Sequence, residues 1–310
     1  MTGASPRHVR VRRPGALTTI QDCGRPGYAH LGVPRSGALD APAHHQANQL
    51  VGNPPGAAVL ETTLTGVAVV AEADVTVAVT GAGAAVRVDG EPAELRSVIV
   101  VRAGQVLDVG SARLGVRSYV AFGGGLQVPR VLGSAATDLL SGLGPARLAV
   151  GDVLTLGEPG DADADGAGDV DGTADGGGGW PAGCSLLGVP PAGVPVEVAE
   201  LLIRLGPRDD WLSAEGLAAL RTGEWTVTPH SNRVGMRLAG TPVPRARFGE
   251  LASEGVVAGA VEALPDGQLV VFLADHPTTG GYPVAAVVDP VSLPSCAQAR
   301  PGLRVRFRLA

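Results

Sequence analysis

The chain has 310 residues, of which 45% are hydrophobic and 17% charged, which is enough apolar material for one large or two ordinary cores. It contains no lysine, so a Walker A phosphate loop, a Schiff base and a covalently attached biotin are excluded, because each requires a lysine side chain. Six aspartates between residues 161 and 175 account for the net charge of −6, and the balanced remainder argues against a nucleic-acid-binding surface.

The N-terminal residues are basic, but no apolar stretch of signal-peptide kind follows them. The basic residues are Arg7, Arg10, Arg12 and Arg13. No segment of the sequence approaches membrane-spanning length. We therefore expect a cytoplasmic protein without a membrane partner.

Residues 41–50 carry the signals of a helix. Asp40 can cap the free amides of the first turn, Pro42 is tolerated within that turn, and Gly52 can end the helix. Two more helices are expected later in the chain. One spans residues 214–221 between Ser213 and Gly223, and a shorter one spans residues 290–298.

Short valine-rich runs between turns predict β-strands on both sides of the middle of the chain. The clearest of them cover residues 75–79, 86–88, 98–101 and 106–109. Asp89-Gly90 and Asp266-Gly267 each separate two such runs and predict type I′ hairpin turns, in which both central residues have positive φ. With 46 glycines and 25 prolines, the chain is expected to be mainly β, with closed or sandwich-like antiparallel architecture in each half.

A Gly/Asp/Ala-rich segment over residues 160–190 predicts a disordered linker. It would separate a β-rich domain at 1–159 from a β-barrel domain at 191–310. Its aspartate run from Asp161 imitates the start of an EF-hand loop. Gly172 stands where that loop needs a bidentate Glu, which favours the linker over a calcium site.

The cysteines and histidines do not suggest a metal site. Cys23, Cys184 and Cys296 are odd in number, far apart and without a Cys-x-x-Cys spacing, so we expect reduced thiols. His44 and His45 are adjacent on the predicted helix and should point in different directions. We expect them on a surface or an interface, with no shared metal ion.

Polar residues interleaved with Gly and Pro mark candidate binding loops in both halves. In the first half they are Gln21, Asp22, Arg25, Ser36 and Asp40. In the second half they are Arg208, Arg233, Arg237, Ser253, Glu254, Asp275, Thr278, Thr279 and Tyr282. Arginine forks, a carboxylate and hydroxyls beside glycines suit a carboxylate or phosphate ligand. Buried Arg–Asp pairs that fasten loops to the barrels are the alternative interpretation.

In their order these clusters resemble a known family. The residues that carry the resemblance include Thr19 to Asp22 with Gly24-Arg25, Ser36-Gly37-Ala38, Asn48, Leu60-Glu61, Tyr119 to Gly124, Gly206-Pro207-Arg208, Ser231-Asn232-Arg233, Ser253-Glu254-Gly255 and Thr278 to Tyr282. The chain is similar to the family of 5-oxoprolinase C subunits, allophanate hydrolase subunit 2 and biotin-dependent carboxyltransferases, which includes KipA-like proteins. The resemblance implies two cyclophilin-like β-barrel units.

The function implied by the resemblance is that of an ATP-dependent 5-oxoprolinase. Together with its A and KipI-like B subunits, such a C subunit opens 5-oxo-L-proline to L-glutamate, and we expect no activity from it alone. ATP with Mg²⁺ is the expected cofactor, with no biotin on this chain. One alternative is the carboxyltransferase half of a biotin-dependent urea carboxylase, although that form lies within a much longer chain. Another is a regulatory partner of a KipI-like kinase inhibitor.

The resemblance also suggests roles for the polar residues. Arg233, Arg237 and Asp275 are expected to be catalytic, with Asp275 accepting a proton or contacting a metal ion. The other residues of the candidate binding loops are expected to bind substrate or phosphate, or to line a cleft or a subunit interface. The chain departs from the family's usual residues at Ala135, Ala136, Glu262 and Pro277, and Glu262 replaces a glutamine. If these side chains touch substrate, specificity should differ.

Overall fold

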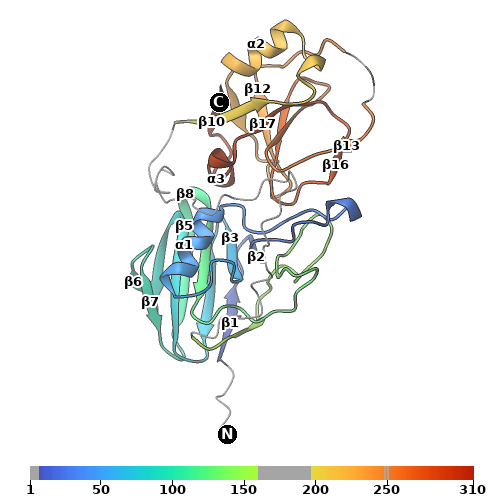
Figure 1. Cartoon of the computed structure of the whole chain (residues 1–310). Helices are drawn as coiled ribbons and strands as arrows, with labels where there is room; N and C mark the ends of the chain where they lie inside the picture. The colour runs from blue at the N-terminus through green and yellow to red at the C-terminus, as the bar shows by residue number, and fades with distance from the viewer. Residues whose placement is uncertain (1–6, 160–196, 248, 250) are drawn as a thin grey trace. The chain divides into compact units, whose positions relative to one another are not determined.

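The computed structural model describes residues 7–159, 197–247, 249 and 251–310, which form two compact units (Figure 1). In the described part, the N-terminal unit consists of residues 7–25, 40–137 and 142–159. The C-terminal unit consists of residues 26–39 and 138–141 and the described residues from 197 onward. The predicted linker and its EF-hand-like aspartate run lie outside the described residues, and so does Cys184. The expected domain boundaries therefore stay predictions.

A nine-stranded antiparallel sheet forms the N-terminal unit. Its strands are β1 (Arg7–Arg13), β2 (Leu17–Gln21), β3 (Val59–Thr63), β4 (Val67–Ala71), β5 (Val75–Val88), β6 (Glu91–Ala93), β7 (Val98–Val101), β8 (Val106–Phe122) and β9 (Val153–Leu156). The order runs β2-β3-β8-β4-β1-β9, and β5 pairs with β6, β7 and β8. Buried valines of β1, β4, β5 and β8 form much of the core. Their β-branched side chains fit the pleated surface well.

Strand β5 runs through glycines that look like turn signals in the sequence. Two separate runs, 75–79 and 86–88, were expected, but they belong to one strand whose register against β8 shifts between Gly81 and Val86. Gly81 has a φ of 80°, and a Cβ there would collide with the carbonyl oxygen of Arg117. The glycines therefore permit bulges within a continuous strand instead of ending it.

Helix α1 (Ala41–Leu50) confirms the predicted helix over residues 41–50. The carboxylate of Asp40 caps it by accepting a 3.1 Å hydrogen bond from the amide of Ala43. The helix packs against β5 and β8 (Figure 1). The expectation of a surface or interface position is wrong for His44, which is buried on the face of the helix that meets the sheet.

The two predicted hairpin turns differ in the structure. Asp89 and Gly90 both have positive φ, 50° and 88°, as a type I′ turn requires. At the second turn only Gly267 has positive φ, 79°, so the type I′ prediction is wrong there. The amide of Gly267 donates to the carbonyl of Leu264 at 3.0 Å, and that of Leu264 to the carbonyl of Gln268 at 2.9 Å. These two hydrogen bonds are typical of a hairpin loop longer than two residues, in which a glycine with positive φ forms a β-bulge.

A closed seven-stranded barrel forms the C-terminal unit, in the order β10-β17-β14-β15-β12-β11-β18. Its strands are β10 (Val198–Leu205), β11 (Trp225–Val227), β12 (Gly235–Gly240), β14 (Ala260–Ala263), β15 (Leu269–Phe272), β17 (Val284–Val288) and β18 (Arg304–Leu309). Neighbouring strands are antiparallel except β10 and β18, which are parallel. The mainly β class expected from the sequence is confirmed.

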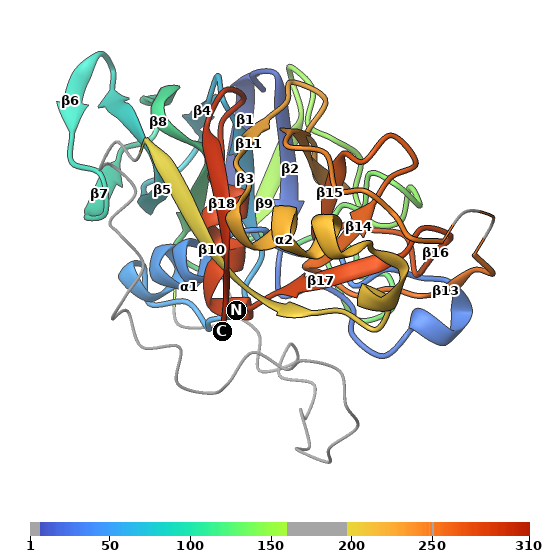
Figure 2. The ribbon, with the colours of Figure 1, turned by 90° about the horizontal axis from the view of Figure 1, so that it is seen from above.

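Short elements complete the C-terminal unit. They are the two-stranded sheet of β13 (Glu254–Gly255) and β16 (Thr279–Gly280), and the helices η1 (Ala29–Leu31), η2 (Asp209–Trp211), α2 (Ala214–Thr222), η3 (Pro290–Ser292) and α3 (Leu293–Ala297). Helix α2, capped by Ser213, lies against β18 (Figure 2). The helix expected over 290–298 is split into a 3-10 turn and a short α-helix. None of the described helices is long and apolar enough to cross a membrane.

Trp225 anchors the core of the barrel. Its side chain has no solvent exposure, and its ring centroid lies 5.0 Å from that of Phe307. The indole nitrogen donates a 2.9 Å hydrogen bond to the carbonyl of Thr241. The large buried ring is therefore both packed and satisfied in its polar group.

Replacing Trp225 by Ala should destabilise the barrel by about 3–5 kcal/mol, because it opens a cavity where a fully buried ring lay. Chemical unfolding followed by circular dichroism measures this loss. The control is Val291→Ala, since Val291 is 57% exposed and its truncation should change the unfolding free energy by less than about 0.5 kcal/mol. Equal effects of the two substitutions would contradict the assignment of Trp225 to the core.

Candidate functional site

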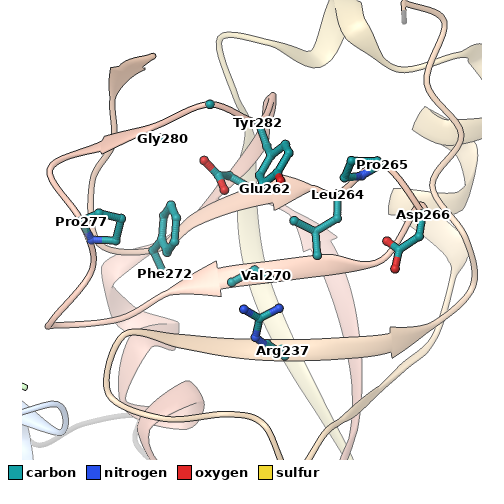
Figure 3. A pocket seen from close by; sticks show the side chains of 11 residues that line it. Arg237, Glu262, Leu264, Pro265, Asp266, Val270, Phe272, Pro277, Gly280 and Tyr282 are labelled. Carbon is teal, nitrogen blue, oxygen red and sulfur yellow. The ribbon is translucent and has the colours of Figure 1, made fainter. Parts of the chain in front are cut away.

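A pocket of about 540 Å³ lies on the outer face of the C-terminal barrel (Figure 3). Its lining comes from strands β12, β14 and β15, from the turn between β14 and β15, and from the segment around β16. The lining residues are Arg237, Glu262, Leu264, Pro265, Asp266, Val270, Phe272, Pro277, Gly280, Gly281 and Tyr282. Most of this surface is apolar, and the ionisable side chains on it are few, as in many small-molecule sites.

Strand alternation places one row of side chains in the pocket. Met236 on β12 and Val261 on β14 belong to the barrel core, so Arg237 and Glu262 beside them point outward. Arg237 is paired with Val270, and Val270 with Glu262, across three neighbouring strands. Two strand spacings separate the Cα atoms of Arg237 and Glu262 by about 9–10 Å. A guanidinium and a carboxyl group therefore flank an apolar floor (Figure 3).

Glu262 is the buried acid of this pocket. Burial raises its pKa from 4.5 to about 7, and the charge of Glu254 adds to the increase. The backbone amide of Tyr282 and the guanidinium of Arg245 oppose this shift without cancelling it. Its side chain is 3% exposed, and Oε1 has no hydrogen-bond partner among the described residues. Such a carboxyl can donate a proton or a hydrogen bond near neutral pH.

Gly280 leaves room for the Glu262 carboxyl group. A Cβ atom at position 280 would collide with Oε1 of Glu262, so a side chain there would displace the acid. Gly280 lies on β16, opposite Glu254 on β13. The two-stranded sheet thus covers Glu262 with backbone, which is why the acid is buried on the outside of a barrel.

Arg208 and Glu254 brace that sheet. Nε and Nη2 of Arg208 donate to the same oxygen of Glu254, Oε2, at 2.8 and 2.6 Å. The predicted ligand residue Arg208 is therefore already engaged by a protein carboxylate, although its side chain is 39% exposed. Thr279 lies on β16 and is exposed, Thr278 precedes it, and Ser253 is exposed just before β13.

Arg233 and Asp275 form a fully buried ion pair away from the pocket lining. Nε of Arg233 donates to Oδ2 of Asp275 at 2.8 Å, and Nη2 donates to Oδ1 at 2.9 Å, with side-chain exposures of 1% and 0%. Oδ1 also accepts from Ser36 Oγ at 2.7 Å, and Oδ2 accepts from the amide of Leu139 at 3.2 Å. Nη2 also donates to the carbonyl of Gly37 at 2.7 Å. Both carboxylate oxygens thus have protein partners, and the expected catalytic role of the pair stays a prediction.

The first-half candidates hold the N-terminal unit together. Asp22 accepts hydrogen bonds from Gly24 N at 2.7 Å, Ser134 Oγ at 2.6 Å and Ala135 N at 2.7 Å. Arg25 donates to the carbonyl oxygens of Val131 and Ala136.

Gln21 and Asp40 are likewise engaged within this unit. Gln21 donates to Thr19 Oγ1 at 3.0 Å and to the Thr137 carbonyl at 2.9 Å. Asp40 caps α1. All four first-half side chains are buried, and Ser36 belongs to the C-terminal unit instead.

The structure therefore divides the candidates into three groups. Arg237 and Tyr282 line the pocket. Arg208, Glu254, Thr278 and Thr279 lie in or beside the sheet of β13 and β16 that covers Glu262. The others lie in buried networks or outside the pocket. Glu262 and Pro277 were noted in the sequence only as departures, yet both line the pocket. The available signal for Glu262 was an acid inside an otherwise apolar strand, Ala260–Ala263.

Comparisons with known proteins give consistent matches. The family described as carboxyltransferase domain, subdomain A and B, matches residues 31–309. The 5-oxoprolinase C subunit of Escherichia coli is 33% identical over 96% of this chain and 90% of its own length. Urea amidolyase of Lachancea kluyveri is 31% identical over 97% of this chain but only 17% of its own length. The crystal structure of TTHA0988 superimposes with a TM-score of 0.80 at 33% identity, covering 99% of this chain and 56% of that one.

Removing either partner of the buried ion pair should destabilise the C-terminal unit. Arg233→Ala or Asp275→Ala leaves an uncompensated buried charge, which costs about 3–5 kcal/mol. Thermal unfolding measures the loss. Arg204→Ala is the matched control, because Arg204 is 76% exposed and lies 3.4 Å from Asp289. A loss no greater than that of Arg204→Ala would contradict the assignment of the pair as a structural anchor.

Glu262 should make stability fall as pH rises. Between its unfolded pKa near 4.5 and its folded pKa of about 7, the unfolded chain releases a proton that the folded chain retains. Folding is therefore increasingly disfavoured across this window, and the loss is complete above pH 7. The melting temperature of wild type, relative to that of Glu262→Gln, should decline from pH 4.5 to 7. Parallel pH profiles for the two proteins would contradict the raised pKa.

Proposed function

The chain belongs to the carboxyltransferase domain family with subdomains A and B, and from this membership we propose that it is the C subunit of an ATP-dependent 5-oxoprolinase. The observation that carries the proposal is end-to-end correspondence with the 5-oxoprolinase C subunit of Escherichia coli, which covers 96% of one chain and 90% of the other. The proposed reaction opens the lactam of 5-oxo-L-proline to L-glutamate. The proposed partners are the A and KipI-like B subunits of such a complex.

The pocket offers complementary groups for such a substrate. 5-Oxoproline carries a carboxylate at one end of a small apolar ring and a lactam amide at the other. The guanidinium of Arg237 would hold the carboxylate, since arginine offers a planar pair of donors. The ring methylenes would lie over Val270 and Phe272, and the amide would face Glu262. The two ends of the substrate would thus match the two ends of the row of side chains, with the carboxylate at Arg237 and the amide at Glu262.

Glu262 is the proposed proton donor. Amide resonance makes the lactam carbonyl a poor electrophile, so ring opening needs the carbonyl oxygen polarised and the departing nitrogen protonated. A carboxyl group whose pKa is about 7 is half protonated at neutral pH and suits this task. Oε1 has no hydrogen-bond partner among the described residues but is buried against Gly280, so the carboxyl group would have to turn toward the cavity to reach the lactam.

The pocket does not fit the triphosphate of ATP. Among the described residues that line it, Arg237 is the one basic side chain, and Glu262 and Asp266 contribute two carboxyl groups. Neighbouring carboxylates repel phosphate oxygens, and the sequence has no lysine that would offset them. In this proposal ATP and its Mg²⁺ are therefore held mainly by a partner protein of the complex. The present chain binds the small substrate and supplies the proton for ring opening.

Co-expression with candidate A and B subunits tests the proposal. Glutamate release from 5-oxo-L-proline and ATP is measured with all three chains and with each one omitted. Glutamate that appears only with all three establishes this chain as an oxoprolinase subunit. An intact complex that releases none would reject the proposal.

Arg237→Ala should lower kcat/KM for 5-oxoproline by about tenfold to a hundredfold, the range expected for losing a hydrogen-bonded charge partner. The loss should be largely an increase in KM, because the carboxylate does not change during the reaction. Arg221→Ala is the control, since Arg221 is exposed at the end of α2 and should leave both constants unchanged. An unchanged KM in Arg237→Ala would remove this arginine from the substrate site.

The urea amidolyase match favours a second candidate, the carboxyltransferase half of a biotin-dependent carboxylase. The relative from Lachancea kluyveri aligns with 97% of this chain. Without lysine this chain cannot carry biotin, so the cofactor would have to arrive on another protein. Purification of the complex followed by an avidin blot separates the two candidates. A biotinylated partner supports carboxyl transfer, and its absence from an active complex supports 5-oxoprolinase.

A further inference from the structure

Three side chains with metal-binding atoms converge in the N-terminal unit, outside the site described above. They are Cys23, directly after β2 and Asp22, and the neighbouring residues His44 and His45 of α1. One ligand atom from each lies within 4.8 Å of the other two. Adjacent helix residues do diverge, as the sequence indicated, but the loop after β2 brings a thiol to both imidazoles. This convergence removes the geometric reason for expecting that the two histidines cannot share an ion.

A backbone carbonyl group holds the ring of His44 in place. Its Nε2 lies 3.0 Å from the carbonyl oxygen of Ala57, which also accepts a 2.8 Å hydrogen bond from Asn48. When Nε2 carries the hydrogen, the other ring nitrogen keeps a lone pair, although the backbone of Gln21 also lies within hydrogen-bonding reach of this ring. Metal-bound histidines commonly donate their second nitrogen to a carbonyl in this way.

Cys23 and His45 are already separated by a distance that suits a shared ion. The sulfur lies 3.8 Å from Nε2 of His45. In a tetrahedral zinc site, bonds of about 2.3 Å to sulfur and 2.0–2.1 Å to nitrogen place these atoms about 3.6 Å apart. Cys23 is exposed and His45 is half-buried, so small side-chain rotations can bring all three donors to one ion.

We propose that Cys23, His44 and His45 form a binding site for a divalent transition metal of the zinc class. A thiolate with two imidazoles is a borderline-soft ligand set, which suits Zn²⁺ or Co²⁺ and disfavours Mg²⁺ and Ca²⁺. Three protein ligands leave one coordination position, which the exposure of Cys23 places toward solvent. The bound ion would fasten the loop after β2 to α1, two elements that otherwise meet through hydrogen bonds and packing.

Cobalt titration of the full chain under reducing conditions tests the site. One equivalent of Co²⁺ should produce a thiolate-to-cobalt charge-transfer band, and Zn²⁺ should displace it and raise the melting temperature. Cys23→Ser should abolish the band, and His45→Ala should weaken binding about tenfold or more. These two variants carry the test because neither replaces a fully buried residue. His230→Ala is the matched control, since His230 is exposed and lies on the C-terminal unit.

Any of three results would overturn the proposal. The first is the lack of a charge-transfer band in wild type at millimolar Co²⁺. The second is a band that survives Cys23→Ser, which would assign the thiolate to Cys184 or Cys296. Equal loss of affinity in His230→Ala and His45→Ala would likewise reject the site, because it would indicate general surface histidine binding. None of these outcomes depends on 5-oxoprolinase activity.

Discussion

The buried pair of Arg233 and Asp275 is the interaction on which the C-terminal unit depends. A charged pair with almost no solvent exposure is stable only when its remaining hydrogen-bonding groups are satisfied. Ser36, Gly37 and Leu139 supply those partners, from segments far away in the sequence. The pair therefore binds residues 26–39 and 138–141 to the barrel, which is why the compact unit includes pieces from three parts of the chain. The geometry of the pair serves mainly to hold the segments of the C-terminal unit together.

In the barrel, strand alternation places the residues that form the core on the inside and the residues that line the pocket on the outside. Inward residues such as Met236, Val261 and Val271 form the core, while their neighbours Arg237, Glu262 and Val270 form one row on the outside. An outward acid would normally be solvated and ionised. Here the sheet of β13 and β16 covers it, so Glu262 loses water without gaining a full set of partners. The same burial that lowers stability above neutral pH gives the acid a useful pKa.

The glycine at position 280 links the fold to this site. Strand pairing with Glu254 requires backbone close to Glu262, and only a residue without Cβ leaves space for the carboxyl group. Arg208 in turn fixes Glu254 by two hydrogen bonds. Residues that the sequence groups together as ligands therefore have different tasks. Some hold the cover in place, and others face the cavity.

Local signals in the sequence were enough to establish the mainly β class, the helix over residues 41–50 with its Asp40 cap, and the family. Strand alternation, helix capping and ordered motifs are each recognised over short stretches of sequence. They did not separate Arg233 from Arg237, four residues apart, although one is buried in an ion pair and the other lines the pocket. The meeting of Cys23 with two histidines and the burial of Glu262 were missed as well. These features exist only in the folded chain, because burial and proximity depend on segments that folding brings together from distant positions.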